Sequence, residues 1–236
     1  LNHIARINIA WNSLNEKTVA VKEKGAAYAD LSELPLPVAT EMHTSDAKYR
    51  YYLNTCAFGY SMTSWTWTRW QQEIDFMALN GVNMPLALTG QNSVWQRVYR
   101  RLGFTDEQLE GFFSGPAYFN WFWMGNLDGW GGPLPQSFMD DHEQLQKQIL
   151  SAERSLGMTP ILPAFTGHVP PSFKEKFPQA KVRTTEWVNF PEVSILDPSE
   201  ELFTTIGKMF IQEQIDLFLH VFLLVFFFYC ITSSAK

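Results

Sequence analysis

Short apolar segments, each followed by a helical pattern, constrain the fold of this chain more than any other feature. Residues 82–88 and 159–165 are such segments, and each ends in a polar sequence that contains Thr and Gly. Strands that are apolar throughout, rather than alternating, are typical of a parallel sheet covered by helices. The sequence therefore predicts an α/β fold with its ligand site at the carboxyl ends of the strands.

Apolar residues at helical spacing predict the helices between these strands. Thr68 followed by Gln71 resembles a capping box and predicts the start of a helix, and Asn80-Gly81 predicts its end. The residues between 114 and 137 are rich in Gly, Pro and Trp and predict a long functional loop. The other expected elements are a strand at 51–58, helices at 93–102, 106–113 and 142–156, and a helix that begins at Asp197.

Composition and charge exclude several classes of protein. Apolar residues make up 46% of the 236, and 15% are aromatic, which is enough to form a core and excludes general disorder. The net charge is −6 without a cluster of Lys and Arg, so no nucleic-acid partner is predicted. Cys56 and Cys230 are too few for a disulfide scaffold or a multi-cysteine zinc site. The chain opens on Leu1 without a signal peptide, from which we expect a fragment or a processed form.

Several side chains are of types that can act in catalysis, but none of them lies in a convincing catalytic motif. The acidic pair at 140–141 precedes a helix, where the helix dipole favours negative charge. Asp128 is interpreted as a solvated or hydrogen-bonded carboxylate, and Cys56 as a small core residue. His168, at the end of a strand, faces either the core or a ligand. No metal site is predicted from the five dispersed histidines, and no cofactor, because the glycines at 129–132 lack the strand-then-helix setting of a phosphate loop.

Aromatic residues of the long loop are the more suggestive feature. Trp121, Trp123 and Trp130 follow neither helical nor strand periodicity. Aromatic residues exposed on loops often serve binding, and a flat ring can cover the apolar face of a sugar. From composition alone, core packing remains the alternative for these three residues.

Many short motifs, in order along the chain, closely resemble glycoside hydrolase family 89, the alpha-N-acetylglucosaminidases. They extend over about 49–215 and are YRYYLNTC at 49–56, WTWTRWQQEIDFMALNGVN at 65–83, LTGQ at 88–91, WQRV at 95–98, FFSGPA at 112–117, MGNL at 124–127, GPL at 132–134, LGMTPILPAF at 156–165 and GHVP at 167–170.

The resemblance implies a partial (β/α)8 TIM-type barrel in three parts. These are a remnant of a small N-terminal α/β domain with a linker at 1–48, the first part of the barrel at 49–215 and an apolar tail outside the family pattern at 216–236. The tail carries no charge from 217 to 235, which is close to the lower limit of about 17 residues for a membrane span. Membrane insertion through this tail therefore remains an alternative to a mis-spliced end. No oligomeric state is predicted.

The resemblance also implies an activity and a site. The family consists of retaining exo-hydrolases that remove terminal α-linked N-acetylglucosamine from glycans such as heparan sulfate, in lysosomes or outside cells. By position, Asn54 and Cys56 on the first strand and Trp121 and Met124 in the long loop match residues that line the sugar pocket of the family.

The catalytic residues of the family are expected to be missing. The family uses two glutamates, the first in an Asn-Glu motif after the next strand, and here the pattern stops near Gln214. From Leu217 onward the chain contains no Asp or Glu. We therefore assign no catalytic residue and expect this chain to be inactive by itself. A non-catalytic carbohydrate-binding protein and a membrane-inserted fragment remain the alternatives.

Overall fold

The computed structural model describes residues 46–218, together with the backbone of three short strands at 9–12, 17–20 and 223–225. Strands β1 (Ile9–Asn12) and β2 (Lys17–Ala20) pair in antiparallel fashion. The first of them overlaps residues 6–11, whose alternation of polar and apolar residues predicts a strand. The linker and most of the apolar tail lie outside the described residues.

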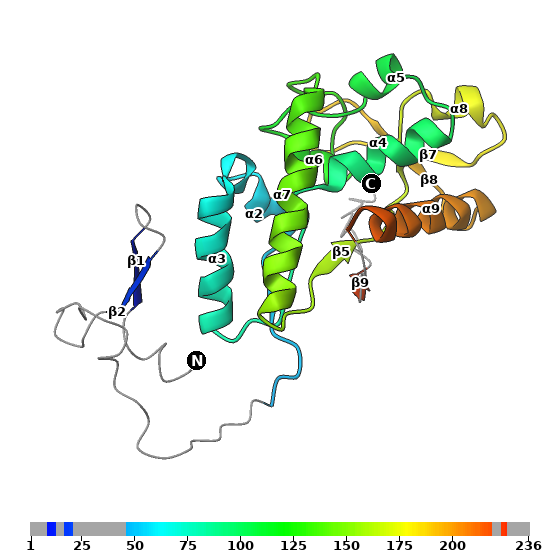
Figure 1. Cartoon of the computed structure of the whole chain (residues 1–236). Helices are drawn as coiled ribbons and strands as arrows, with labels where there is room; N and C mark the ends of the chain where they lie inside the picture. The colour runs from blue at the N-terminus through cyan, green and yellow to red at the C-terminus, as the bar shows by residue number, and fades with distance from the viewer. Residues whose placement is uncertain (1–8, 13–16, 21–45, 219–222, 226–236) are drawn as a thin grey trace.

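Four parallel strands form two hydrogen-bonded pairs, which one bridge joins in the order of the chain; Figure 1 labels the two strands of the second pair, β5 and β9. Strand β3 (Tyr51–Tyr52) pairs with β4 (Met84–Pro85), and β5 (Ile161–Pro163) pairs with β9 (Leu223–Val225). A parallel bridge between Leu86 and Ile161 joins the two pairs. Sequential parallel strands separated by helices are the repeating unit of a (β/α)8 barrel, so the described fold is a partial barrel of this type.

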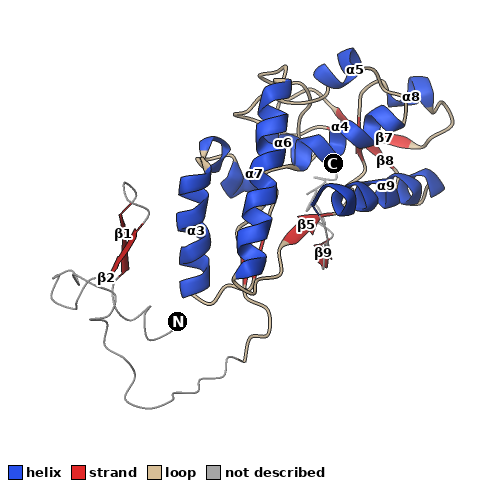
Figure 2. Ribbon diagram, viewed as in Figure 1, coloured by secondary structure: helices blue, strands red, loops and turns tan. Residues whose placement is uncertain are grey.

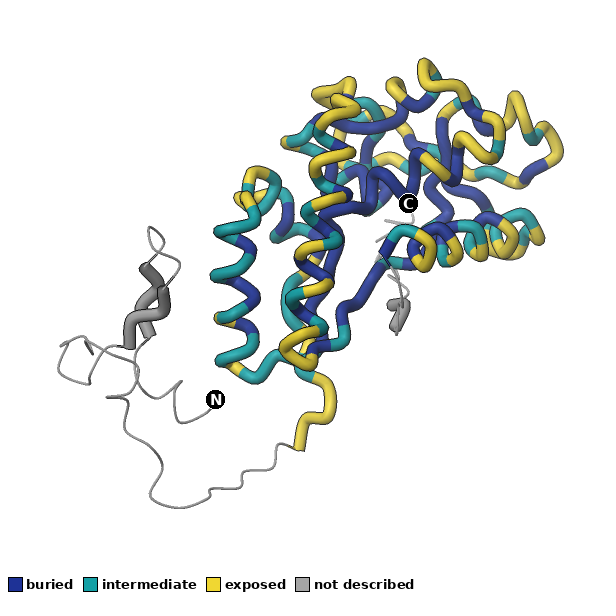
Figure 3. Tube along the Cα trace, viewed as in Figure 1, coloured by how far each residue is buried: buried dark blue, intermediate teal, exposed yellow. Residues whose placement is uncertain are grey.

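Long helices cover the outer side of these strands (Figure 2). Helix α3 spans Trp67–Leu79, α4 Gln91–Arg101, α7 Gln136–Ser155 and α9 Glu201–Phe218. Helix α7 packs against α3, α4 and α9. In Figure 3, α4 is buried along most of its length, whereas α7 alternates between buried and exposed turns. The hydrophobic core therefore lies between the helices and the strands, as the apolar strands predicted.

Ion pairs tie three of these helices together at their polar faces. Arg97 of α4 lies 2.8 Å from the Glu143 carboxylate of α7, and Arg101 lies 3.0 Å from that of Glu213 on α9. Lys147 adds a second cation to Glu143 at 2.8 Å. Both glutamates are buried, and these partners compensate the desolvation of their charges.

Several expected element boundaries are wrong, among them the start of α9, which lies at Glu201 rather than at Asp197. Only 51–52 of the expected strand at 51–58 forms a strand. The side-chain oxygen of Asn54 accepts the backbone N–H of Ala57 and starts the helical turn α2 (Thr55–Phe58). Helix α3 begins at Trp67 with Thr66 as its N-cap, so Thr68 lies inside the first turn. The expected capping box is not formed.

The segments between the long helices are more structured than the sequence predicts. The long loop contains helix α6 (Phe119–Trp123), and α7 begins at 136 rather than at 142. A three-stranded antiparallel sheet of order β6-β8-β7 follows β5, which the sequence did not predict. Among the described residues, no helix combines the length and apolar character that a membrane crossing requires. The remaining short elements are η2 (Met62–Ser64), α5 (Asp106–Glu110), α8 (Phe173–Lys176), β6 (His168–Val169), β7 (Val182–Thr185) and β8 (Val193–Leu196).

Candidate functional site

The candidate site lies just after β3, where α2 packs against α6. The Cys56 Sγ lies 3.7 Å from the Met124 Sδ, so the structure brings together two of the four residues expected in a sugar pocket. Behind them, the buried Asn120 donates from Nδ2 to the Cys56 carbonyl oxygen at 3.4 Å. A Cβ on Gly59 would lie 2.3 Å from the Asn120 side chain, so the close packing of α2 on α6 depends on this glycine.

The other two expected residues occupy different settings. Asn54 is exposed and acts as the N-cap of α2 rather than standing on a strand. Trp121 lies on α6, half-buried, and stacks on Trp187 with ring centroids 4.9 Å apart and an interplanar angle of 20°. Trp187 was not predicted as a site residue, because it belongs to no sequence motif and lies 66 positions after Trp121 in the chain. Trp187 lies two residues after the end of β7 (Val182–Thr185), a strand that the sequence did not predict, so no sequence signal pointed to it.

Two residues considered as ligand contacts lie in the core instead. His168 is 0% exposed, and its Nε2 lies 2.5 Å from the Asp128 Oδ1. The imidazole is surrounded by the rings of Trp95, Phe112 and Phe122. The pair therefore anchors the long loop, which carries Asp128, to strand β6. Trp123 is also a core residue, since its buried Nε1 donates to the Asn92 Oδ1 at 2.8 Å.

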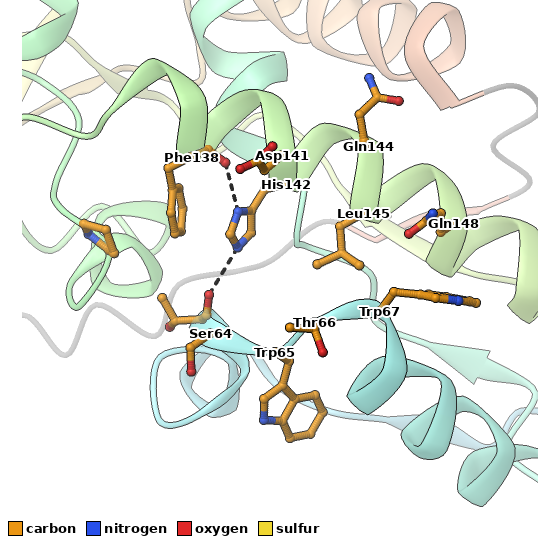
Figure 4. A pocket seen from close by; sticks show the side chains of 12 residues that line it. Ser64, Trp65, Thr66, Trp67, Phe138, Asp141, His142, Gln144, Leu145 and Gln148 are labelled. Atoms are coloured by element: carbon orange, nitrogen blue, oxygen red, sulfur yellow. Dashed lines mark hydrogen bonds between the residues drawn. The ribbon is translucent and has the colours of Figure 1, made fainter. Parts of the chain in front are cut away.

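A groove of about 510 Å³ lies beside this region, between α7 and the segment 63–67 (Figure 4). Its walls are mainly apolar, and none of the four expected sugar-pocket residues lines it. His142 crosses its floor, with Nδ1 2.9 Å from the Phe138 carbonyl oxygen and Nε2 3.2 Å from that of Thr63. Burial lowers the pKa of His142 below its ordinary value of 6.5, although the two carbonyl contacts oppose the shift. The ring is therefore neutral near pH 7.

We expect this histidine to make the fold sensitive to acid. Because its pKa is lower in the folded than in the unfolded chain, stability is retained above 6.5 and lost as the pH falls through the folded-state pKa. His142→Gln keeps a donor but removes the titration. Urea unfolding midpoints at pH 7.5 and pH 5 are expected to fall more for the unmodified chain than for the variant. An equal fall in both proteins would contradict this assignment.

The side chains of the described site are of kinds that contact ligands. Among residues 46–218 no group of three His, Cys, Asp or Glu side chains is placed to hold a metal ion. Cys56 is a free thiol whose described side-chain contact is the Met124 thioether. The site offers an aromatic face, a thioether and an amide, which suit contact with an uncharged, partly apolar ligand.

The parallel strands, with these residues at a carboxyl end, define the class of (β/α)-barrel domains. Residues 50–224 match the family described as "Alpha-N-acetylglucosaminidase (NAGLU) tim-barrel domain". The chain therefore belongs to the alpha-N-acetylglucosaminidase family, as its motifs predicted.

Known proteins of this family show the extent of the similarity. Human alpha-N-acetylglucosaminidase is 46% identical over 176 residues, which cover 72% of this chain and 24% of the human protein. This chain thus spans about a quarter of the length of that relative. The matched range ends at 224, inside the apolar segment.

Solved structures of a family 89 glycoside hydrolase from Clostridium perfringens share the fold. One, in complex with 2-acetamido-1,2-dideoxynojirmycin, is 34% identical with a TM-score of 0.69 and covers 74% of this chain and 20% of that one. Another carries two glutamate-to-glutamine substitutions and holds its substrate GlcNAc-alpha-1,4-galactose. It is 29% identical with a TM-score of 0.76 and covers 93% of this chain and 24% of that one.

Proposed function

We propose that this chain carries the sugar-binding part of a retaining exo-alpha-N-acetylglucosaminidase that acts on terminal α-linked N-acetylglucosamine of glycans such as heparan sulfate. The family match over 50–224 carries this proposal. It is supported by the Cys56–Met124 contact and by Trp121, which lies on helix α6 three residues before Met124. Together with Asn54, these are the substrate-binding residues that we propose.

The 236-residue chain is proposed to bind without hydrolysing. Retaining hydrolysis needs one carboxyl group that protonates the leaving oxygen and a second that attacks the anomeric carbon, about 5–5.5 Å apart. Near the candidate site, Asp128 is engaged by His168 and anchors a loop. The positions from 217 onward contain no Asp or Glu. We accordingly assign no residue of this chain a catalytic role.

The remaining proposals follow from the family and from composition. The division into 1–48, 49–215 and 216–236 stays a proposal, as does a lysosomal or extracellular location. Membrane insertion through 217–235 is the alternative, and retention of the chain in membranes after carbonate extraction would favour it.

We expect the purified chain to release no 4-nitrophenol from 4-nitrophenyl α-N-acetylglucosaminide above the uncatalysed rate. In calorimetry it should bind 2-acetamido-1,2-dideoxynojirmycin, and Trp121→Ala should weaken that binding about tenfold, because a stacked aromatic face is lost. Trp121→Phe should restore most of the affinity.

The matched control is Phe76→Ala, which removes an exposed ring of α3 that contacts Tyr52 rather than any of the four proposed sugar-binding residues. It should leave the affinity unchanged. Measurable turnover by the unmodified chain would overturn the proposed inactivity, and absence of binding would overturn the proposed sugar site.

A further inference from the structure

The turn at 124–128, directly after α6, carries one of the proposed sugar-binding residues. Met124 begins this turn, and its Sδ lies 3.7 Å from the Cys56 Sγ. The N–H of Asn126 donates to the Trp121 carbonyl oxygen at 3.0 Å, so the turn continues the backbone hydrogen bonds of α6. Where this turn lies therefore decides whether Met124 meets Cys56.

His168 lies beside the turn at two points. Its Nε2 lies 2.5 Å from the Oδ1 of Asp128, the last residue of the turn. Near the start of the turn, Gly125 has a φ of 66°, and a Cβ on it would lie 3.8 Å from the Cβ and Cγ of His168. One side chain is thus next to both the residue that follows Met124 and the residue that ends the turn.

His168 is itself held firmly in the core. It opens strand β6, which pairs with β8 opposite Ile195, and it is 0% exposed. The Tyr99 hydroxyl of α4 donates to its carbonyl oxygen. A close-packed interior leaves such a side chain little room to move. The position of the turn is therefore set by the core rather than by the surface loop to which it belongs.

The bond between Asp128 and His168 has no described substitute. A carboxylate can only accept, so the imidazole Nε2–H is the donor. The other polar atoms of the two side chains, Asp128 Oδ2 and His168 Nδ1, are buried without a hydrogen-bond partner among the described residues. Loss of either side chain leaves the other unsatisfied and releases the end of the turn.

We propose that Asp128 and His168 are a positioning pair, which holds Met124 against Cys56 and thereby sets the affinity of the site for its sugar ligand. This inference rests on the proposed function and adds to the site two residues that do not touch the ligand. Binding groups must be held within about 0.5 Å of their productive position by the residues behind them. The pair supplies that support for Met124.

The first measurement follows the Cys56 thiol in the absence of sugar. In a Cys230→Ser background of the whole chain, the rate of alkylation by iodoacetamide reports how well Met124 covers the Cys56 Sγ. We expect Asp128→Ala to raise this rate about tenfold, because the turn is released. Asp128→Asn keeps an Oδ1 that accepts the Nε2–H and should restore the slow rate. If Asp128→Ala does not fold, Asp128→Ser, which is too short to reach the imidazole, takes its place.

The second measurement is a calorimetric titration with 2-acetamido-1,2-dideoxynojirmycin. Asp128→Ala and His168→Phe should each weaken binding about tenfold, and Asp128→Asn should bind like the unmodified chain. Because the two side chains act as one unit, the double variant Asp128→Ala/His168→Phe should bind no more weakly than either single variant.

The matched control is Ser93→Ala, which also removes one buried hydrogen bond. The Ser93 Oγ donates to the Met139 carbonyl oxygen at 3.1 Å and joins α4 to α7. Its loss should lower the urea unfolding midpoint but change neither the alkylation rate of Cys56 nor the affinity for the sugar ligand.

The outcomes separate the two proposals. If the unmodified chain does not bind the sugar ligand, the proposed function fails, whereas the alkylation rate still tests the positioning of Met124. An alkylation rate that Asp128→Ala leaves unchanged, or that Ser93→Ala raises equally, would overturn that positioning. A raised rate with unchanged affinity, or losses of affinity that multiply in the double variant, would show that the pair does not set the affinity.

Discussion

Gly115→Ala is expected to lower the free energy of unfolding by about 3 kcal/mol or more. A Cβ at this position would lie 1.9 Å from the carbonyl oxygen of Gly131 and 2.5 Å from its carbonyl carbon. Both are backbone atoms of the turn that holds Trp130, so neither can move aside as a flexible side chain could. The methyl group would therefore separate the two ends of the long loop and break the bond from the Gly115 N–H to the Trp130 oxygen.

Gly207→Ala is the matched control, because the same methyl group is added in α9 with its nearest neighbour 3.9 Å away. It should raise stability by about 0.5–1 kcal/mol, since alanine is the better helix former. Urea unfolding followed by circular dichroism measures both variants. Equal midpoints for Gly115→Ala and the unmodified chain would show that the loop ends do not pack as described.

Glu153→Gln is expected to stabilise the chain at neutral pH and to have little effect near pH 4. Glu153 on α7 is 1% exposed, and its Oε2 has no hydrogen-bond partner among the described residues. Burial raises the pKa of this carboxyl well above its ordinary 4.5, while the charge of Arg154 opposes the shift. The carboxyl group thus stabilises the fold only while it is protonated.

The pH dependence follows from the raised pKa. The contribution of Glu153 is fully present below 4.5 and is lost as the pH rises through the folded-state pKa. At pH 7 the variant should gain about 1–3 kcal/mol, the usual cost of an unsatisfied buried polar group. Thermal unfolding at pH 4 and pH 7 tests this, with Glu110→Gln on the exposed side of α5 as the control. A gain that is equal at both pH values would exclude titration as its cause.

The fold was largely predictable because its repeating unit is local. The apolar segments at 82–88 and 159–165 contain β4 and β5, and the helical patterns correspond to α3, α4, α7 and α9. Errors arose where one side chain redirected the backbone. Asn54 caps a helical turn in a run of residues that favour strands, and no periodicity records that hydrogen bond.

The sites were predictable only through the family motifs. Asn54, Cys56, Trp121 and Met124 were identified by position, and nothing in their local spacing indicates that Cys56 meets Met124. His168 was expected at the end of the strand at 159–165, but it opens the separate strand β6, and its contact with Asp128 places it in the core. The stacking of Trp121 on Trp187 joins helix α6 to the loop after β7, two segments with unrelated sequences.

The sequence by itself determined the family, the alternation of strands and helices, and the absence of acidic residues after position 216. These depend on residue identity and short-range periodicity, which a linear chain records directly. Only the tertiary structure decided which aromatic rings stack on one another and which polar groups are buried without partners. Those properties depend on contacts between residues far apart in the chain, and such contacts leave no periodic trace in it.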